Sequence, residues 1–305
     1  MGHEEIPAID LLALKDRAPN ALAAMRIAAT QTGFATVYNT ALSGARVRDV
    51  IETYRKFFHL PSAEKEKFNM ATTGSNRGWG RPGSEQVNPD ANPDFKQYFD
   101  CGLTLPEGHA LTKMPVYAPN LWPDTPSDFS DVVSTYYEEA RGVAMGVLRA
   151  LSVSLGRPED AFDAAFETPM ALLRGNYYPT RPDWATDKDF GIATHTDYGC
   201  LTLLATDGAP GLEVRKRGGG WIPVQAEPGH FVINFGEMMQ FWTGGDVLAT
   251  PHRVIGTTHE RISIPMFFNP SHDINVAPPG SDQVIQAGDH LAKRFNETYA
   301  HLKTG

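Results

Sequence analysis

His195-Thr196-Asp197, followed at a distance by His252, is the stretch of this 305-residue chain that decides its fold. Residues two apart in a strand point to the same face, so the imidazole of His195 and the carboxylate of Asp197 would converge on one ion across about 7 Å of backbone. A third ligand has to come from another strand. His252 lies 55 residues beyond Asp197, far enough for several short strands to turn back. Two imidazoles and one carboxylate on one face of an ion suit Fe(II) and leave its opposite positions open.

A second pair of residues spaced for one strand face follows the last of these ligands. Arg261-Ile262-Ser263 begins 9 residues after His252. A guanidinium beside a hydroxyl suits a carboxylate, because the paired N–H donors of arginine match its two oxygens. Alone, a His-x-Asp pair is more often an ordinary surface strand, and a strand arginine more often a salt-bridge partner. Together, the two pairs predict a metal site with a carboxylate clamp beside it.

Composition and charge exclude several classes of function. The net charge of −9 argues against a nucleic-acid partner, which needs clustered Lys and Arg. Apolar runs such as 142–155 are too short and mixed to cross a bilayer, and the start MGHEEIPAID lacks the features of a signal peptide. Cys101 and Cys200 are too few for a disulfide framework. We therefore expect a cytoplasmic enzyme with no membrane partner.

The first part of the chain reads as helical and the later part as strands. Helices are expected at 20–32, 43–58, from 61 onward, 128–155 and 286–302. Residues 72–94 form a Gly/Pro-rich loop, a candidate lid. After Met170, short β runs separated by turns are expected at 171–178, 191–195, 200–205, 212–215, 221–224, 230–234, 253–256 and 261–268. We expect one catalytic domain over 1–305: a mostly helical part (1–170), a core with the metal site (171–270) and a C-terminal segment with a helix (271–305).

Several motifs outside the metal ligands give the chain a family resemblance. It resembles the iron- and 2-oxoglutarate-dependent oxygenases, in the branch that includes isopenicillin N synthase and many plant hydroxylases. The matching stretches are Asn176-Tyr177-Tyr178-Pro179, His195-Thr196-Asp197-Tyr198-Gly199, Leu201-Thr202-Leu203-Leu204, Pro210-Gly211-Leu212-Glu213-Val214, Trp221-Ile222-Pro223-Val224, Thr250-Pro251-His252-Arg253-Val254 and Arg261-Ile262-Ser263. The plant branch usually continues its Asn-Tyr-Tyr-Pro with Pro and Cys, whereas this chain has Thr180-Arg181-Pro182.

The resemblance implies a fold and a set of ligand contacts. The fold would be mainly β with flanking helices, built on a double-stranded β-helix, or jelly roll. Fe(II) would be held by His195, Asp197 and His252, with 2-oxoglutarate as co-substrate and O2 as oxidant. Arg261, Ser263 and Tyr178 would bind the distal carboxylate of 2-oxoglutarate, and Asn176 would lie near its metal-bound end.

The resemblance also implies an activity, to which two alternatives remain. Decarboxylation of 2-oxoglutarate to succinate would be coupled to oxidation of a small organic substrate, most commonly hydroxylation, with desaturation or ring closure open. One alternative is an oxidase of the same fold that takes its electrons from its substrate or from ascorbate. The other is a jelly-roll binding protein without turnover. The branch is often monomeric, and we expect a monomer.

Substrate contacts are expected from aromatic and cationic residues near the loop and the strands. Aromatic walls with one or two cations would suit a small molecule bearing a carboxylate. The candidates are Trp79, Arg81, Phe95, Lys96, Tyr98, Phe99, Arg174, Tyr198 and Phe268.

Overall fold

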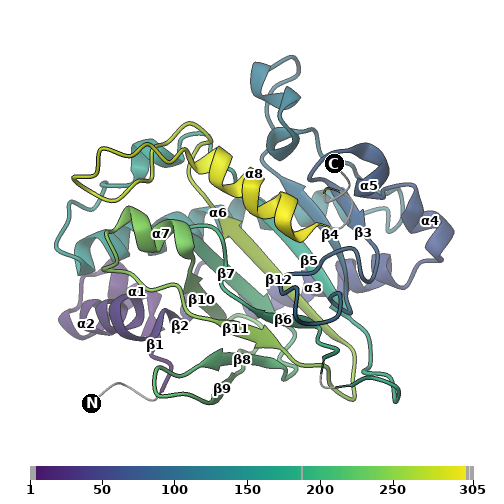
Figure 1. The fold of residues 1–305 in the computed structure, drawn as a ribbon, viewed down its shortest axis with the longest axis horizontal. Coiled ribbons are helices and arrows are strands. Elements are labelled where there is room, and N and C mark those ends of the chain that lie inside the picture. The colour runs from purple at the N-terminus through teal and green to yellow at the C-terminus, as the bar shows by residue number, and fades with distance from the viewer. Residues whose placement is uncertain (1–4, 187, 300–301, 303–305) are drawn as a thin grey trace.

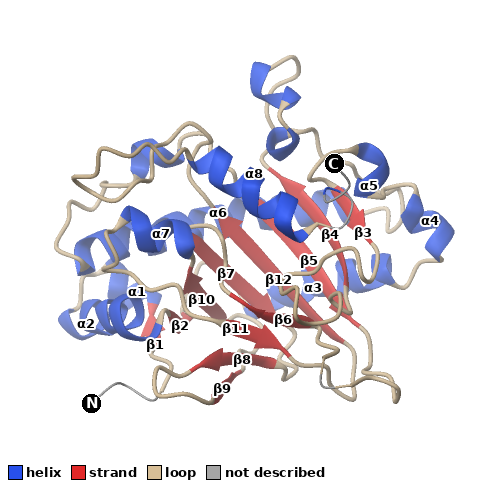
Figure 2. Cartoon of the chain, in the orientation of Figure 1, coloured by secondary structure: helices blue, strands red, loops and turns tan. Residues whose placement is uncertain are grey.

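A computed structural model describes residues 5–186, 188–299 and 302 of the chain (Figure 1). Two β-sheets form its core, with helices around them (Figure 2). Within these residues the larger sheet has eight strands, ordered β1-β2-β10-β7-β12-β5-β4-β3. They are β1 (Ala8–Asp10), β2 (Phe34–Tyr38), β3 (Gly78–Gly80), β4 (Gln97–Gly102), β5 (Leu172–Tyr178), β7 (Leu201–Thr206), β10 (Phe231–Phe235) and β12 (Arg261–Phe268).

The smaller sheet has four strands in the same described part of the chain, ordered β6-β11-β8-β9. They are β6 (Ile192–His195), β8 (Leu212–Arg215), β9 (Trp221–Val224) and β11 (His252–Val254). Together the two sheets form the double-stranded β-helix that the resemblance implies. Antiparallel pairing of β11 with β6 sets His252 directly opposite His195, which carries both imidazoles to one face.

Helices flank the sheets on both sides. They are α1 (Leu11–Lys15), α2 (Pro19–Ile27), α3 (Gly44–Phe58), α4 (Ser62–Glu66), α5 (Met70–Thr73), α6 (Phe129–Ser154), α7 (Glu237–Trp242) and α8 (Ala287–Thr298), with a π-helical turn at Ala28–Thr32 and 3₁₀ turns at Ala110–Lys113, Pro115–Tyr117 and Asp163–Phe166. Helices α3 and α6 pack against β12, and α8 crosses the opposite side of the large sheet (Figure 1).

Local sequence explains why the long helices begin and end where they do. The hydroxyl of Ser43 accepts a hydrogen bond from the backbone N–H of Arg46, which caps α3 as its position before an apolar-periodic run predicts. Val47, Val50, Tyr54 and other apolar residues on one face of α3 are buried against the sheet. At the end of the π-helical turn, Gly33 adopts a left-handed conformation with φ of 70°, which glycine tolerates best.

The structure corrects three expectations about the elements. The N-terminal part is not only helical, because β1 to β4 lie within it and join the large sheet; the expected loop at 72–94 includes β3, which holds Trp79. Strands β2 and β4 pair with β10 and β5, far away in the sequence, and β1 and β3 pair in turn with β2 and β4, so local pattern gave no sign of them. Strand β6 ends at His195, so Asp197 lies just beyond the strand.

The final helix is shorter than expected. It ends at Thr298, and residues 300 and 301 of the expected helix lie outside the described residues. Residues 1–4 also lie outside the described residues; they begin the stretch in which no signal peptide is expected. Among the described residues, no helix combines the length and apolar character needed to span a bilayer.

Candidate active site

Three side chains gather where the two sheets meet, and they are the predicted metal ligands. One ligand atom each from His195, Asp197 and His252 lies within 4.8 Å of the others. Asp197 Oδ1 is 3.6 Å from His195 Nε2 and 3.7 Å from His252 Nε2. The donor set, two imidazoles and a carboxylate on one side, fits Fe(II) with open positions.

Neighbouring groups fix which atom of each side chain is left for a metal. His195 Nδ1 donates to the carbonyl of Ala193 at 2.8 Å and His252 Nδ1 to the carbonyl of Thr250 at 3.1 Å, so both Nε2 atoms remain as ligands. Asp197 Oδ2 accepts hydrogen bonds from Thr202 at 2.5 Å and Asn234 at 2.7 Å. Only Oδ1 of the carboxylate then faces the two Nε2 atoms.

The electrostatics of the site keep Asp197 ionised and His252 neutral. Burial raises the pKa of Asp197, but the hydrogen bond from His195 and the electrostatic interactions with both imidazoles outweigh it and hold the pKa well below its usual range. Burial and the neighbouring His195 lower the pKa of His252 to about 4. A neutral imidazole and an ionised carboxylate are the forms that bind a metal ion.

One pocket beside the three ligands has the composition of a carboxylate site. Strands β12 and β5 pair Arg261 with Tyr178 and Ser263 with Asn176, so all four side chains share one face. That face lines a pocket together with His195, Asp197 and His252. The four residues assigned to 2-oxoglutarate by resemblance are therefore brought together next to the candidate ligands.

The buried guanidinium of Arg261 is the observation that tests whether a carboxylate fits this pocket. Arg261 is 2% exposed, yet its Nε and Nη1 have no hydrogen-bond partner among the described residues. The amide oxygen of Asn176 is likewise buried without one. A buried cation without partners is costly. A carboxylate such as the distal one of 2-oxoglutarate would supply acceptors for these donors, so the residues present fit this co-substrate.

A second, larger pocket opens on the other side of the ligands. His195, Asp197, Asn176, Ile192 and Phe267 line both pockets, so the candidate metal position lies between them. The second pocket encloses about 830 Å³, including open solvent. Much of its wall is apolar: Val87, Val116, Met170, Leu172, Phe267, Leu291 and Phe295. Its size and position make it the candidate substrate pocket.

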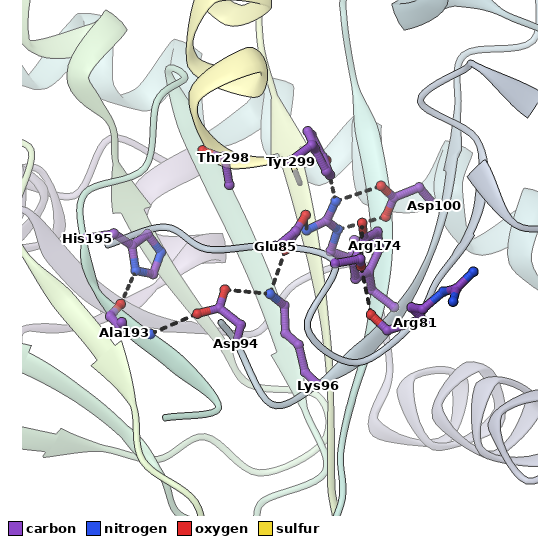
Figure 3. Close-up of polar contacts among 12 residues, drawn as sticks. Arg81, Glu85, Asp94, Lys96, Asp100, Arg174, Ala193, His195, Thr298 and Tyr299 are labelled. Atoms are coloured by element: carbon purple, nitrogen blue, oxygen red, sulfur yellow. Dashed lines mark hydrogen bonds and ion pairs between the residues drawn. The ribbon is translucent and has the colours of Figure 1, made fainter. Parts of the chain in front are cut away.

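A buried cluster of charged residues forms the polar wall of the substrate pocket (Figure 3). Glu85 accepts from Lys96 Nζ at 2.6 Å and from Arg174 Nη1 at 2.7 Å. Behind them, Asp94 accepts from Lys96 at 3.0 Å, and Asp100 accepts two hydrogen bonds of 2.7 Å from Arg174. All five side chains are less than 9% exposed.

Three of the nine predicted substrate contacts line this pocket: Lys96, Arg174 and Tyr198. The other six do not. Arg81 is 58% exposed and points away from the cluster (Figure 3). Phe95 packs edge-on against Trp184. Tyr98 is buried with its ring 4.1 Å from the guanidinium of Arg174, outside the pocket lining, and the other three are buried elsewhere: Trp79, Phe99 and Phe268.

Sequence reasoning missed several pocket residues. For Phe268 the miss is one of strand phase, because its neighbour Phe267 faces both pockets. Glu85 sits in an irregular loop, and Thr298 and Tyr299 come from the end of α8, where no local pattern marks a pocket wall. The signal available for Glu85 was its position in a Gly/Pro-rich loop shortly before Lys96.

Comparison with known proteins agrees with this geometry. Residues 6–125 match the family described as the N-terminal domain of a non-haem dioxygenase in morphine synthesis, and residues 169–270 match the 2OG-Fe(II) oxygenase superfamily. A homoarginine-6-hydroxylase of Oryza sativa subsp. japonica is 32% identical over 257 residues, covering 82% of this chain and 78% of that protein. The 2-oxoglutarate-dependent dioxygenase traH of Penicillium crustosum is 32% identical, covering 96% of this chain and 93% of its own.

Solved structures give the same result. JOX2 in complex with 2OG, Fe and JA superimposes with a TM-score of 0.80 at 30% identity, covering 98% of this chain and 88% of that one. A Neurospora crassa protein in complex with alpha-KG and thymine gives a TM-score of 0.85 at 25% identity, with 97% and 98% coverage. The chain therefore belongs to the 2OG-Fe(II) oxygenase superfamily, in the isopenicillin N synthase-like branch of plant and fungal dioxygenases, and is a non-haem enzyme dependent on Fe(II) and 2-oxoglutarate.

Proposed function

We propose that this oxygenase couples decarboxylation of 2-oxoglutarate to the hydroxylation of a small organic substrate, with the whole chain acting as one catalytic unit. His195, Asp197 and His252 hold the iron, and Arg261, Ser263, Tyr178 and Asn176 hold 2-oxoglutarate. The observation that carries the proposal is the buried guanidinium of Arg261, whose unpaired donors share a pocket with the three ligands.

The chain's own residues supply binding and orientation in this mechanism. Arg261 and Ser263 receive the distal carboxylate of 2-oxoglutarate, and the face shared with Tyr178 and Asn176 directs the keto acid end toward the ligands. Thr202 and Asn234 orient the carboxylate of Asp197. When bound, Fe(II) supplies the activation of O2 that links decarboxylation to substrate oxidation. The apolar wall of the substrate pocket keeps water away from the reacting atoms.

Binding of iron and co-substrate can be tested without knowing the substrate. Fe(II) and 2-oxoglutarate added under argon should give the visible charge-transfer band of the chelate. His195→Ala should abolish the band and Arg261→Ala should weaken it, because one removes a ligand and the other the carboxylate clamp. His109→Ala, on a histidine outside both pockets, is the matched control. An unchanged band in the His195 variant would contradict the ligand assignment.

Succinate release separates this proposal from its alternatives. Full O2 consumption with substrate and no 2-oxoglutarate would point to the oxidase that draws electrons from its substrate or from ascorbate. Binding of Fe(II) without any turnover would point to a jelly-roll binding protein.

The substrate is to be identified by screening. Thymine and JA, which occupy the similar solved structures, are the first compounds to screen. A substrate carboxylate was expected from the sequence, but Lys96 and Arg174 already pair with carboxylates of the chain. The cytoplasmic location and the monomeric state stay predictions.

A further inference from the structure

The charged cluster that forms the polar wall of the substrate pocket is balanced once the buried neighbour Arg77 is included. Its carboxylates are Glu85, Asp94 and Asp100, and its cations are Lys96 and Arg174. Arg77, fully buried, adds a third cation that interacts electrostatically with Asp100. Three negative and three positive groups leave no net charge for a substrate ion to neutralise. A single added charge, of either sign, would meet like charges in a pocket screened from water.

Among the described residues, most but not all donors and acceptors of the cluster have hydrogen-bond partners. Lys96 has three N–H groups, of which Glu85 and Asp94 take two. Arg174 has five, and Asp100, Glu85 and Tyr299 take four of them. Each oxygen of Glu85 accepts one hydrogen bond and can accept another. The wall therefore offers donors on both sides of an acceptor.

The distances decide which chemical group fits this wall. Lys96 Nζ lies 2.6 Å from one oxygen of Glu85, and Arg174 Nη1 lies 2.7 Å from the other. Any acceptor bound to either nitrogen is thus a close neighbour of the Glu85 carboxylate. A substrate carboxylate in that position would be repelled. A neutral carbonyl would not be, and a donor next to it could use the remaining lone pair of Glu85.

We propose that Glu85, with Lys96 and Arg174, determines substrate specificity by selecting an uncharged group that carries a hydrogen-bond acceptor beside an N–H or O–H donor, as an amide or lactam does. The rest of the substrate is apolar, to match the apolar wall that completes the pocket. The inference rests on the proposed function, since it takes this pocket as the substrate site of the oxygenase. It replaces the carboxylate-bearing substrate expected from the sequence.

A purely structural role for the cluster makes a different prediction. Ion pairs in a protein interior are often no more stabilising than apolar residues of similar volume. The cluster does tie β4, β5 and the loop before β4 together, and Gln86 in that loop also donates to Thr298 at the end of α8. If that were its whole role, changing one charge would alter stability and leave the ranking of ligands unchanged.

Matched probes test the proposal. Compounds with one apolar body, cyclohexyl or phenyl at several chain lengths, would carry an amide, a carboxylate or an ammonium group. Binding is read from the change in the Fe(II)–2-oxoglutarate band under argon. The wild-type protein should prefer amides over both ions by on the order of tenfold. Glu85→Gln leaves the pocket with a net positive charge and should shift the preference toward carboxylates, whereas Lys96→Gln should shift it toward ammonium.

The two charge changes act in opposite directions, so either variant tests the idea if the other fails to fold. Glu139→Gln, in an ion pair with Arg46 outside the pocket, is the matched control and should keep the wild-type ranking. A wild-type preference for carboxylates, no response to any amide up to its solubility limit, or an unchanged ranking in both variants would overturn the proposal. A protein that forms the chelate band but fails these tests loses only this inference. One that forms no band loses the proposed function.

Discussion

At the scale of single residues, the site is organised by hydrogen bonds that decide which atoms remain available. Thr202 and Asn234 occupy one oxygen of Asp197, and backbone carbonyls occupy Nδ1 of both histidines. One oxygen and two nitrogens are left facing one another. Such outer partners fix ligand orientation and raise metal affinity.

Thr202→Val should weaken Fe(II) binding about 10- to 100-fold, because the ligand carboxylate loses one of its two anchoring donors. Anaerobic competition with a metal-binding dye measures the affinity. Thr206→Val on the same strand removes a hydroxyl that donates to the carbonyl of Ala226 instead, and it should leave iron affinity unchanged. Equal losses in both variants would show that Thr202 acts only through stability.

Arg261→Lys should raise the Kd of 2-oxoglutarate about tenfold, and Arg261→Ala about 100-fold, because lysine keeps the charge but loses the paired N–H geometry. Fe(II) affinity without 2-oxoglutarate should not change in either variant. Titration of the chelate band gives the Kd, with Arg46→Lys as control. If the lysine variant bound 2-oxoglutarate as weakly as the alanine variant, the charge alone would contribute nothing to binding, and the expected tenfold difference would be contradicted.

At the scale of elements, the site depends on how closely helix α3 approaches strand β5. Gly175 lies between Arg174, which lines the substrate pocket, and Asn176, which lines both pockets. A Cβ at Gly175 would stand 2.3 Å from the ring of Tyr54 in α3. Only glycine lets the buried ring lie this close to the strand.

Gly175→Ala should lower the free energy of unfolding by about 1–3 kcal/mol, the usual effect of overpacking a core. Gly142→Ala in α6 is the control, since its Cβ would meet nothing within 4 Å, and it should raise stability by about 0.5–1 kcal/mol. Urea unfolding measures both. Two variants of equal stability would contradict the packing argument.

The elements also show what the sequence could and could not predict. The strands at 212–215, 221–224 and 261–268 have the predicted bounds, because each is a short apolar or alternating run between turn residues. Strands β1 to β4 were missed, since β2 and β4 depend on partners far along the chain and the edge strands β1 and β3 depend on β2 and β4. The candidate metal and co-substrate residues lie in family motifs at fixed spacing. Glu85 and the end of α8 line the pocket through tertiary packing alone, so no spacing marks them.

At the scale of the whole molecule, the buried charges link stability to pH. Burial raises the pKa of Glu85, but Arg174 and Lys96 outweigh it and lower the pKa from 4.5 to about 2. A carboxylate with a lowered folded-state pKa stabilises the fold above its unfolded pKa, and that stability is lost as pH falls through the folded pKa. Burial also raises the pKa values of Asp94 and Asp100, and there it outweighs the neighbouring cations, so the net shift of both is upward.

Comparison with Glu85→Gln isolates the contribution of this one carboxylate. Between pH 4.5 and 2 the wild-type protein should lose about 3 kcal/mol more of its unfolding free energy than the variant loses. Chemical unfolding at a series of pH values checks this difference. Parallel curves for the two proteins would show that Glu85 is not held ionised by its partners.

Glu85 and Lys96 come from the N-terminal half of the chain, whereas the candidate iron and 2-oxoglutarate residues all lie between 176 and 263. Two of the three polar residues proposed to select the substrate thus lie apart in the sequence from the candidate iron and 2-oxoglutarate residues, whereas Arg174 and most of the apolar wall come from the later part of the chain. Such a division lets substitutions in residues 76–96 change the substrate during evolution without disturbing the reaction. Exchanging that segment between relatives would change the charged part of the pocket wall while leaving the candidate iron and 2-oxoglutarate residues in place.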